Sequence, residues 1–498
     1  MKPGYIPKQD RKTLLFLADD CRLPSGIGTM TRELMIGTAH IYNYVQVGGG
    51  VNHPDVGRVL DLSQDANREA AIDDASIFLY PYNGYGDPDL IRLLIDKHKV
   101  DGIVHFTDPR YFVWLYRMSA ELRQKVPIFY YNIWDDLPFP HYNLPYYESC
   151  DLLMGISKQT KNINKQVLTY SNTTVPVDLD QPDSRPADSN KRPCNISYVP
   201  HGINTKYIYP VTRDHAAVQQ LRQKLFGTAN PDFVLLHNNR NVRRKMTSDV
   251  VLAFREFYLQ LTPEQQQGVR LVLHTDPVDE NGTDLPTLIR DLASELEDKI
   301  VFTHARYSFQ DINWLYNACD VVINIASNEG WGLSCTEALM AGVPVINNVT
   351  GGLQDQLRFE DAQGRWIEFD EQFASNHNGR YRTHGIWGKA VFPASISIQG
   401  SIPTPYIFDD RASILDVAAT IKQWYETPTQ QRVDAGLEGN RWVCSEEAGM
   451  TATAMCDRFA KAINNTFASW TPPNRFQLFN ISKQLANSTN KVTGICLQ

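Results

Sequence analysis

The chain has 498 residues, 42% of them hydrophobic, which predicts two or three globular domains. Its formal net charge of −8 argues against a polyphosphate as the dominant partner but is compatible with a local basic cleft. It has no run of about 18 apolar residues, and its start lacks the apolar core of a secretory signal, so neither a membrane span nor secretion is expected. Eight scattered cysteines, without a CxxC pair or a Cys/His cluster, favour reduced thiols in a cytoplasmic protein over disulfides or zinc.

Two glycines mark the first predicted strand-to-helix connection. Residues 12–18 are apolar and predict a strand, and residues 29–38 have a helical pattern. Gly26 and Gly28 lie between them, where a Gly-x-Gly sequence lets the backbone approach a phosphate closely. The third glycine of a dinucleotide fingerprint is missing, so this loop is a weak signal on its own.

Three polar or aromatic candidates follow predicted strands of the first half. His105 lies in the stretch 103–108, and Trp134 and Asp135 follow a strand predicted at 128–132. Each is a candidate to contact a substrate. A lone histidine at a strand end is more often a hydrogen-bonded structural residue, however, and a Trp-Asp-Asp turn can simply cap a loop.

A basic loop follows a predicted strand in the second half. Residues 233–236 are apolar, residues 248–257 have a helical pattern, and Arg240 and Lys245 lie between them. Two fixed cations beside a diphosphate would neutralise the charge that builds on a leaving nucleotide. The alternative is a solvated basic loop or a nucleic-acid patch, since two more arginines lie in the same segment.

The most informative segment is SNEGWGLSCTEALMAGVPVINNVTGG at 327–352. A mostly β-branched run at 320–326 predicts a strand buried on both faces, and residues 336–341 predict a helix that ends at Gly342. The helix N-terminus would direct free N–H groups and the positive end of its dipole at a diphosphate.

Two glutamates flank this turn. Glu337 is expected in the first helical turn, where its carboxylate would accept two hydrogen bonds from a ribose diol. Glu329 precedes the turn and would face another part of the same ligand. Strand, glycine turn and helix is also the ordinary unit of any doubly wound domain, and a first-turn glutamate is favoured by the helix dipole alone.

The segment at 327–352 resembles the E-x7-E signature of retaining glycosyltransferases of family 4, EGFGLPxxEAMAxGxPVVxxxxGG. The loop with Arg240 and Lys245 is similar to the family's G-R-x-x-x-x-K element, with Asn239 in place of the glycine. The resemblance covers about residues 12–360. It implies an α/β protein of the GT-B fold, in which two Rossmann-like doubly wound domains face each other across a cleft.

The resemblance also implies roles for single residues. Arg240 and Lys245 would hold the donor pyrophosphate, and Glu329 would contact hydroxyls of the transferred sugar. Many relatives have a sugar-contacting histidine where this chain has Trp134, which leaves the donor sugar less defined than the reaction class. No metal site is expected. The further residues expected to bind substrate are Gly26, Gly28, Glu337, Trp331, Gly332, Leu333, Trp134, Asp135 and His105.

The sequence predicts the domain boundaries. Residues 1–207 are expected to form an N-terminal, acceptor-side domain, and residues 208–456 a C-terminal nucleotide-sugar-binding domain. A C-terminal helix within about residues 457–498 is expected to pack back onto the first domain. Residues 376–410 are predicted to be an irregular insertion that shapes acceptor choice or an oligomer contact, or is only a surface embellishment.

The resemblance implies transfer of a sugar from a nucleotide diphosphate sugar to an acceptor hydroxyl, with retention, without a metal and with no cofactor besides the donor. Nucleotide base, sugar and oligomeric state stay open, as does the acceptor, whether saccharide, lipid-linked, small molecule or modified nucleic acid. One alternative keeps the chemistry but uses nucleic acid as acceptor, as in phage enzymes that glycosylate modified DNA bases. Another is a GT-B sugar-nucleotide 2-epimerase with His105 or Asp135 as acid or base. A third is a catalytically silent sugar-binding module, against which the four charged motif residues argue.

Overall fold

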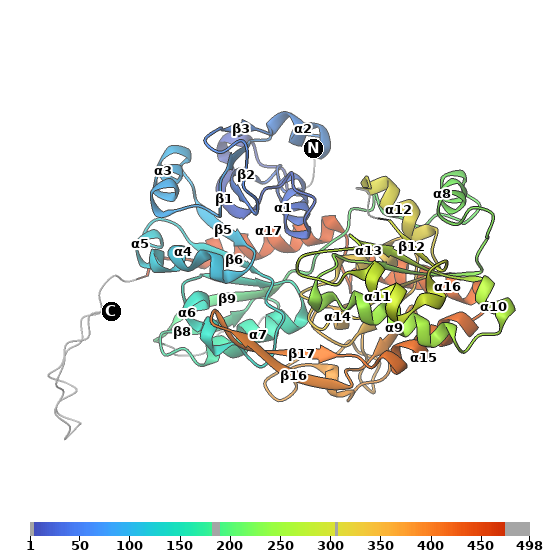
Figure 1. The fold of residues 1–498 in the computed structure, drawn as a ribbon. Coiled ribbons are helices and arrows are strands. Elements are labelled where there is room, and N and C mark those ends of the chain that lie inside the picture. Colours follow the sequence, from blue (N-terminus) through green and yellow to red (C-terminus); the bar gives the residue numbers. More distant parts are fainter. Residues whose placement is uncertain (1–3, 182–189, 304–306, 474–498) are drawn as a thin grey trace, which may run out of the picture.

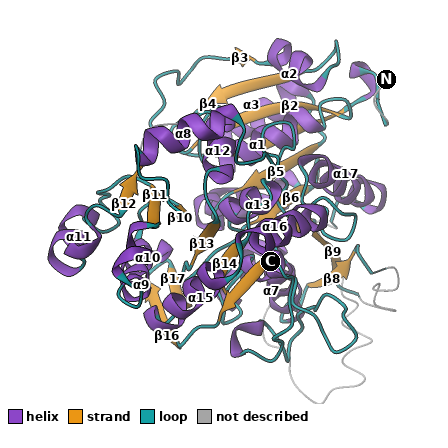
Figure 2. Ribbon diagram, turned by 90° about the vertical axis from the view of Figure 1, so that its right-hand side faces the viewer, coloured by secondary structure: helices purple, strands orange, loops and turns teal. Residues whose placement is uncertain are grey.

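The computed structural model describes residues 4–181, 190–303 and 307–473, which form two lobes (Figure 1). Each lobe is built on one large, mostly parallel sheet with helices on both faces, and Figure 2 shows this layering from the side. The predicted α/β architecture of two doubly wound domains is confirmed.

The first lobe contains a nine-stranded sheet in the order β3-β4-β2-β1-β5-β6-β7-β9-β8, in which only the β3–β4 pair is antiparallel. Its strands are β1 (Lys12–Asp19), β2 (Tyr42–Gly49), β3 (Leu60–Asp61), β4 (Ile77–Pro81), β5 (Gly102–Phe106), β6 (Ile128–Asn132), β7 (Leu152–Gly155), β8 (Thr174–Asp178) and β9 (Arg192–Tyr198). Its helices are α1 (Gly26–Gly37), α2 (Ser63–Ala70), α3 (Pro88–His98), α4 (Val113–Arg117), α5 (Ser119–Leu122), α6 (Leu144–Glu148) and α7 (Lys158–Thr169), with 3-10 turns η1 (Lys8–Asp10), η2 (Pro109–Phe112) and η3 (His141–Asn143).

The second lobe contains a six-stranded parallel sheet in the order β12-β11-β10-β13-β14-β15. Its strands are β10 (Phe233–Asn238), β11 (Val269–His274), β12 (Ile300–Phe302), β13 (Val321–Asn324), β14 (Val345–Asn348) and β15 (Gly388–Val391). Its helices are α8 (Ala216–Phe226), α9 (Thr247–Tyr258), α10 (Pro263–Gln267), α11 (Leu285–Leu292), α12 (Phe309–Asn317), α13 (Leu333–Met340), α14 (Leu353–Leu357), α15 (Ile414–Glu426) and α16 (Thr429–Val443), with η4 (Arg243–Lys245), η5 (Ser294–Leu296) and η6 (Asn376–Asn378).

Strand side chains alternate between two cores, as the period of two in a strand requires. In β1, Leu14 and Phe16 belong to the core that contains residues of α1 and α17, whereas Leu15 and Leu17 belong to the core on the other face, with residues of α3 and α7. All four side chains are buried, which explains why this strand is a continuous apolar run in the sequence.

The last described helix, α17 (Ala452–Ser469), links the lobes. It follows α16 of the second lobe and contacts α1, β7 and β9 of the first (Figure 1). The helix begins before residue 457, and the end of the predicted span, 474–498, lies outside the described residues.

The prediction of an irregular segment at 376–410 is wrong. The chain there forms η6, β15 and an antiparallel hairpin of β16 (Ser395–Ser401) and β17 (Thr404–Arg411). The alternating sequence Ser-Ile-Ser-Ile-Gln at 395–399 has the period of a strand, a signal that the Gly and Pro content of the segment obscured. Within the described ranges, no helix has the length and apolar character needed to cross a bilayer.

Candidate active site

The glycine turn after β13 places a helix N-terminus at the junction of the two lobes. Gly332 has a φ of +88° and precedes α13, which no side chain caps. A side chain on Gly332 would also meet Leu353, so both space and backbone conformation favour glycine. The helix begins at Leu333 rather than at residue 336, and Glu337 therefore lies in its second turn, a correction to the predicted first.

Lys245 and Glu329 meet at this junction. The Lys245 ammonium donates to Glu329 Oε2, and both side chains are about nine-tenths buried. Burial lowers the pKa of Lys245, although Glu329 opposes the shift. Burial alone would raise the pKa of Glu329, but Lys245 and Arg244 outweigh it and hold that pKa below its ordinary value.

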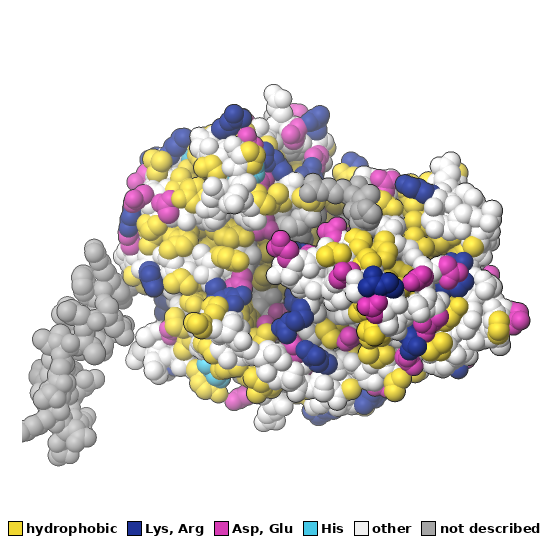
Figure 3. All heavy atoms as spheres, in the orientation of Figure 1, with side chains coloured by type: hydrophobic (Ala, Val, Ile, Leu, Met, Phe, Trp, Pro, Cys, Tyr) yellow, Lys and Arg dark blue, Asp and Glu magenta, His cyan; other side chains and the backbone are white. Residues whose placement is uncertain are grey.

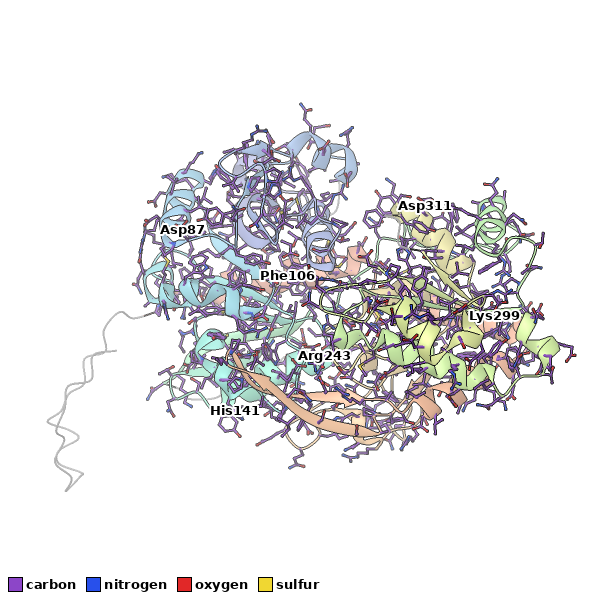
Figure 4. The ribbon with its side chains drawn as sticks, in the orientation of Figure 1. Asp87, Phe106, His141, Arg243, Lys299 and Asp311 are labelled. Carbon is purple, nitrogen blue, oxygen red and sulfur yellow. The ribbon has the colours of Figure 1, made fainter. Side chains whose placement is uncertain are left out.

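Arg244, rather than Arg240, is the arginine beside this pair. Its Nη1 lies 3.8 Å from Glu329 Oε2 and donates to the carbonyl oxygen of Asn328 at 2.8 Å. Arg240 instead pairs with Asp279 at 2.8 Å and its side chain is 65% exposed. The structure thus brings Lys245 and Glu329 together but not Arg240. Figure 4 labels Arg243, their neighbour in the chain, where the second lobe faces the first.

Glu329 is held in place by the glycine pair that follows β14. The backbone N–H of Gly352 donates to the carbonyl oxygen of Glu329 at 3.0 Å. A Cβ on Gly351, whose φ is +45°, would lie only 2.0 Å from that oxygen. The two glycines therefore allow a contact between two backbones that no other residue type fits.

Glu337 forms a separate polar chain at the same helix. Tyr316 OH donates to Glu337 Oε2 at 2.6 Å and accepts from Asn238 Nδ2 at 2.8 Å. Burial raises the pKa of Glu337 to about 7, against the opposing effect of the Tyr316 hydroxyl. The three residues come from α13, α12 and β10, so Glu337 is oriented by the sheet of the second lobe.

The first lobe approaches α13 through its own glycine loop. A Cβ on Gly26 would lie 3.1 Å from Leu333 Cδ1, so the starts of α1 and α13 face each other. A Cβ on Gly28 would lie 2.7 Å from the carbonyl oxygen of Leu23. Ser25 caps α1 by accepting from Gly28 N at 2.9 Å, and donates to Asp19 at 2.7 Å.

Asp135 also reaches the site from the first lobe. Burial raises its pKa to about 6, which Arg244 opposes and Glu329 reinforces. The next residue, Asp136, accepts from Asn328 Nδ2 at 2.6 Å, a bond between the lobes. A Cβ on Gly351 would lie 3.5 Å from Asp135 Cβ, so Asp135 is next to the glycine pair that holds Glu329, and its contact with substrate stays a prediction.

The side chains of His105, Trp134 and Trp331 are buried. His105 is fully buried, stacks on Tyr130 at 4.3 Å between ring centroids, and has its pKa lowered to about 3 by burial. The Trp134 ring packs on Tyr142 and donates to a carbonyl of its own turn. The Trp331 ring is also buried, 6.3 Å from that of His201. Its place in the core removes His105 from the expected substrate site. Trp134 and Trp331 lie in the loops that carry Asp135 and Glu329, and a contact of either with substrate stays a prediction.

The β16–β17 hairpin reaches across to the first lobe. Phe408 N donates to Leu137 O at 2.6 Å, and Tyr142 OH donates to Tyr406 O at 2.7 Å. Asn328 Nδ2 donates to Phe408 O as well as to Asp136. The hairpin thus connects the loop that carries Glu329 to the loop that follows β6.

Sequence reasoning missed Arg244, Tyr316, Asn328 and the hairpin. Arg244 was visible as a charge but was not aligned with the motif, and Tyr316 lies on a helix whose pattern only predicts burial. Among the described residues, no three His, Cys, Asp or Glu side chains are grouped so that they could hold a metal ion.

Comparisons with known proteins agree with this architecture. Residues 219–376 match the family model "Glycosyl transferases group 1". Alpha-monoglucosyldiacylglycerol synthase of Acholeplasma laidlawii is 30% identical over 173 residues, which cover 35% of this chain and 38% of that protein. D-inositol 3-phosphate glycosyltransferase of Stackebrandtia nassauensis is 30% identical over 187 residues, which cover 37% of this chain and 38% of that protein. The chain thus spans less than half the length of these curated relatives.

Solved structures match over almost the whole chain. Anabaena HepE in complex with UDP-glucose has a TM-score of 0.60 and 16% identity, covering 91% of this chain and 99% of that one. Sucrose-phosphate synthase from Thermosynechococcus elongatus has a TM-score of 0.58 and 17% identity, covering 92% and 100%. At such identities the likeness shows the fold. The chain therefore has the GT-B fold, and its residues 219–376 carry a glycosyl transferases group 1 segment.

Proposed function

We propose that this chain is a retaining glycosyltransferase of family 4 that moves a sugar from a nucleoside diphosphate sugar to an acceptor hydroxyl. The observation that carries the proposal is the convergence of Lys245, Glu329 and Glu337 around the uncapped start of α13. These residues come from the two segments whose sequences resemble the family's motifs.

The donor's parts match three features of the site. Lys245, Arg244 and the helix N-terminus offer positive charge to the diphosphate. The Glu337 carboxylate, oriented by Tyr316, suits the ribose hydroxyls. Glu329 then faces the hydroxyls of the transferred sugar. We retain Arg240 as a further candidate for the diphosphate, reached by leaving Asp279.

The proposed reaction needs no protein nucleophile. The bond between the anomeric carbon and the diphosphate oxygen breaks, and the acceptor oxygen bonds to the same face of the anomeric carbon. The acceptor's proton passes to the departing phosphate oxygen. The protein contributes positioning and charge stabilisation, with Lys245 and Arg244 in the place where other enzymes use a metal ion. We propose neither a metal nor a cofactor besides the donor.

A UDP-sugar is the first donor to test, because structural neighbours were solved with UDP-glucose and with UDP-2-fluoro glucose. The acceptor would enter between the first lobe and the hairpin. One relative is named for the synthesis of a monoglucosyldiacylglycerol and another for glycosyl transfer with D-inositol 3-phosphate, so their names do not choose among acceptor classes.

The alternatives are weaker on the structure. An epimerase would need an acid and a base near the sugar, and His105 is removed from the site by its position in the core. A nucleic-acid acceptor would need a broad basic surface, whereas basic and acidic side chains are interspersed on the face in Figure 3.

Release of nucleoside diphosphate from a panel of UDP-, GDP-, ADP- and TDP-sugars tests the proposal. One donor should be turned over, with an unchanged rate in chelator, and NMR of the product should show the donor's anomeric configuration. Inversion would contradict the mechanism, and loss of activity in chelator would contradict the metal-free site.

A further inference from the structure

A cavity lies where the two lobes and α17 meet, away from the start of α13. It has a volume of about 310 Å³. Strand β9 contributes Ser197 and Tyr198 to its lining. In the first sheet, β9 lies two strands from β6, the strand that precedes Asp135, which is about 10 Å at the usual strand spacing. The cavity shares no lining residue with the α13 site, although Gln159, which follows Lys158, donates to the carbonyl oxygen of Asp135 at 2.5 Å. Its charged and aromatic lining includes Lys158, Lys161, Tyr198, Glu368, Arg458 and Lys461.

Two of the four cations lack a carboxylate partner. Lys161 is matched by Asp178 at 2.8 Å and Asp180 at 2.7 Å. Arg458 donates to a backbone carbonyl at 3.1 Å and lies over the Tyr198 ring, and Lys461 is exposed at the rim. In the part of the chain that the structure describes, no carboxylate oxygen forms an ion pair with Arg458 or Lys461. The four cations therefore exceed the three carboxylates paired with them, Asp178, Asp180 and Glu368, by one.

Lys158 adds a cation with an exchangeable partner. Its side chain is only 7% exposed, whereas Glu368, whose carboxylate lies 2.7 Å away, is 69% exposed. The ammonium is fixed by the carbonyl oxygen of Ile367 at 2.9 Å and by the Trp366 ring at 3.7 Å. A ligand oxygen can therefore replace the Glu368 carboxylate without moving the lysine.

We propose that this cavity binds the phosphate group of a small phosphorylated metabolite, as an effector site distinct from the donor site. Lys158, Arg458 and Lys461 would make charge-assisted hydrogen bonds to the phosphate oxygens. The volume suits a small molecule rather than a polymer. Tyr198 and the carbonyl groups of the lining would contact the rest of the ligand.

Binding would be coupled to the arrangement of the lobes. Lys158 belongs to the first lobe and Glu368 to the second, so displacing Glu368 exchanges an interlobe ion pair for a ligand contact. A ligand that binds one arrangement better shifts the population toward it. We expect occupancy of the cavity to change the rate of sugar transfer. This consequence rests on the proposed function, whereas binding of the ligand does not depend on it.

Calorimetric titration of the full chain with a hexose 6-phosphate tests the site. The compound should bind, inorganic phosphate should bind more weakly, and the unphosphorylated hexose should not bind. Lys461→Glu should weaken binding tenfold or more, and Glu368→Gln should strengthen it several-fold because it removes the competing carboxylate. Both side chains are exposed, so these variants should fold.

Lys224→Glu is the matched control, since it makes the same charge change on an exposed lysine of α8. It should leave the affinity unchanged. Failure of both phosphate compounds to bind would overturn the proposal. So would wild-type affinity in Lys461→Glu, because binding would then lie at another site, such as that of Lys245.

Discussion

Lys245 and Glu329 form a buried ion pair, so the cation expected to hold the donor diphosphate is already neutralised by the carboxylate expected to hold the sugar. A donor diphosphate would compete with Glu329 for Lys245 and release the carboxylate toward the sugar hydroxyls. The two residues should therefore behave as a coupled unit in mutational tests.

Lys245→Ala should lower kcat/KM by about 2 to 4 kcal/mol, because it removes a preorganised charge at the leaving diphosphate. It should also cost about 3 to 5 kcal/mol of stability, since Glu329 is left buried without its partner. The double variant Lys245→Met with Glu329→Gln should regain stability but not activity. Steady-state kinetics and thermal denaturation measure both effects.

Arg243→Ala is the control for this pair, because Arg243 is an exposed cation two residues away. It should change neither quantity by more than a few tenths of a kcal/mol. Near-normal turnover in Lys245→Ala would remove Lys245 from the donor site.

Glu329→Gln should separate nucleotide binding from sugar transfer. The variant keeps Lys245 and relieves it of its counterion, so affinity for the bare nucleoside diphosphate should be unchanged or higher. Because Glu329 acts on the sugar as positive charge develops, kcat should fall about a hundredfold or more. Calorimetry and initial rates check the two parts. Lost nucleotide affinity with normal kcat would contradict the role.

The pKa of about 7 at Glu337 predicts a pH-dependent affinity for nucleotide. An ionised carboxylate accepts hydrogen bonds from ribose hydroxyls better than a protonated one, so affinity should rise from about pH 6 to about pH 8. Glu337→Gln should bind more weakly and without this dependence. If nucleotide affinity had the same pH dependence in Glu337→Gln as in the wild type, Glu337 would be a packing residue and not a ligand of the nucleotide.

The contribution of Glu337 to the stability of the fold should have the opposite pH dependence, decreasing as pH rises. Its folded pKa lies above the ordinary value of 4.5, so the folded state binds the proton more tightly. The contribution is present below about pH 4.5 and is lost as pH rises to about 7. Burial also raises the pKa of Asp355 and Asp410 to about 7. Because these two groups titrate in the same pH range, the contribution of Glu337 has to be measured as the difference in melting temperature between wild type and Glu337→Gln.

The sequence allowed the fold to be predicted because buried parallel strands are uninterrupted apolar runs, as in β1 and β10. It also located Lys245, Glu329 and Glu337, since a glycine turn between strand and helix fixes where such residues lie. It could not separate Arg240 from Arg244, because their side-chain directions depend on Asp279 and Glu329, which are distant in sequence. The burial of His105 could not be predicted for a similar reason, because its aromatic neighbours come from other elements.

Gly351→Ala should impair both stability and sugar transfer. The new Cβ would clash with the carbonyl oxygen of Glu329 and displace that residue. Gly364→Ala is the control, because Gly364 also has a positive φ but has open space around it, so only backbone strain of about 1 to 2 kcal/mol applies. Melting temperatures and kcat of the two variants should differ clearly. Equal effects would mean that the contact with Glu329 does not matter.

Tyr406→Ala should weaken the acceptor more than the donor. The Tyr406 ring packs edge-on against Tyr142 at 4.9 Å, and its removal loosens the hairpin where it meets the first lobe. A loss of about 0.5 to 1.5 kcal/mol corresponds to a rise of roughly two- to tenfold in acceptor KM. Ile398→Ala, at an exposed position of the same hairpin, should have no effect. An equal rise in both Michaelis constants would contradict an acceptor-side role.

Binding of nucleotide sugars to the wild type and to Glu337→Gln and Lys245→Ala most directly tests whether these residues form a donor site. A bound donor raises the melting temperature by mass action. One nucleoside diphosphate sugar should raise that of the wild type, with a smaller shift in Glu337→Gln and in Lys245→Ala. Shifts of equal size in all three proteins would contradict the assignment of these residues, and no shift with any donor would contradict nucleotide-sugar binding itself.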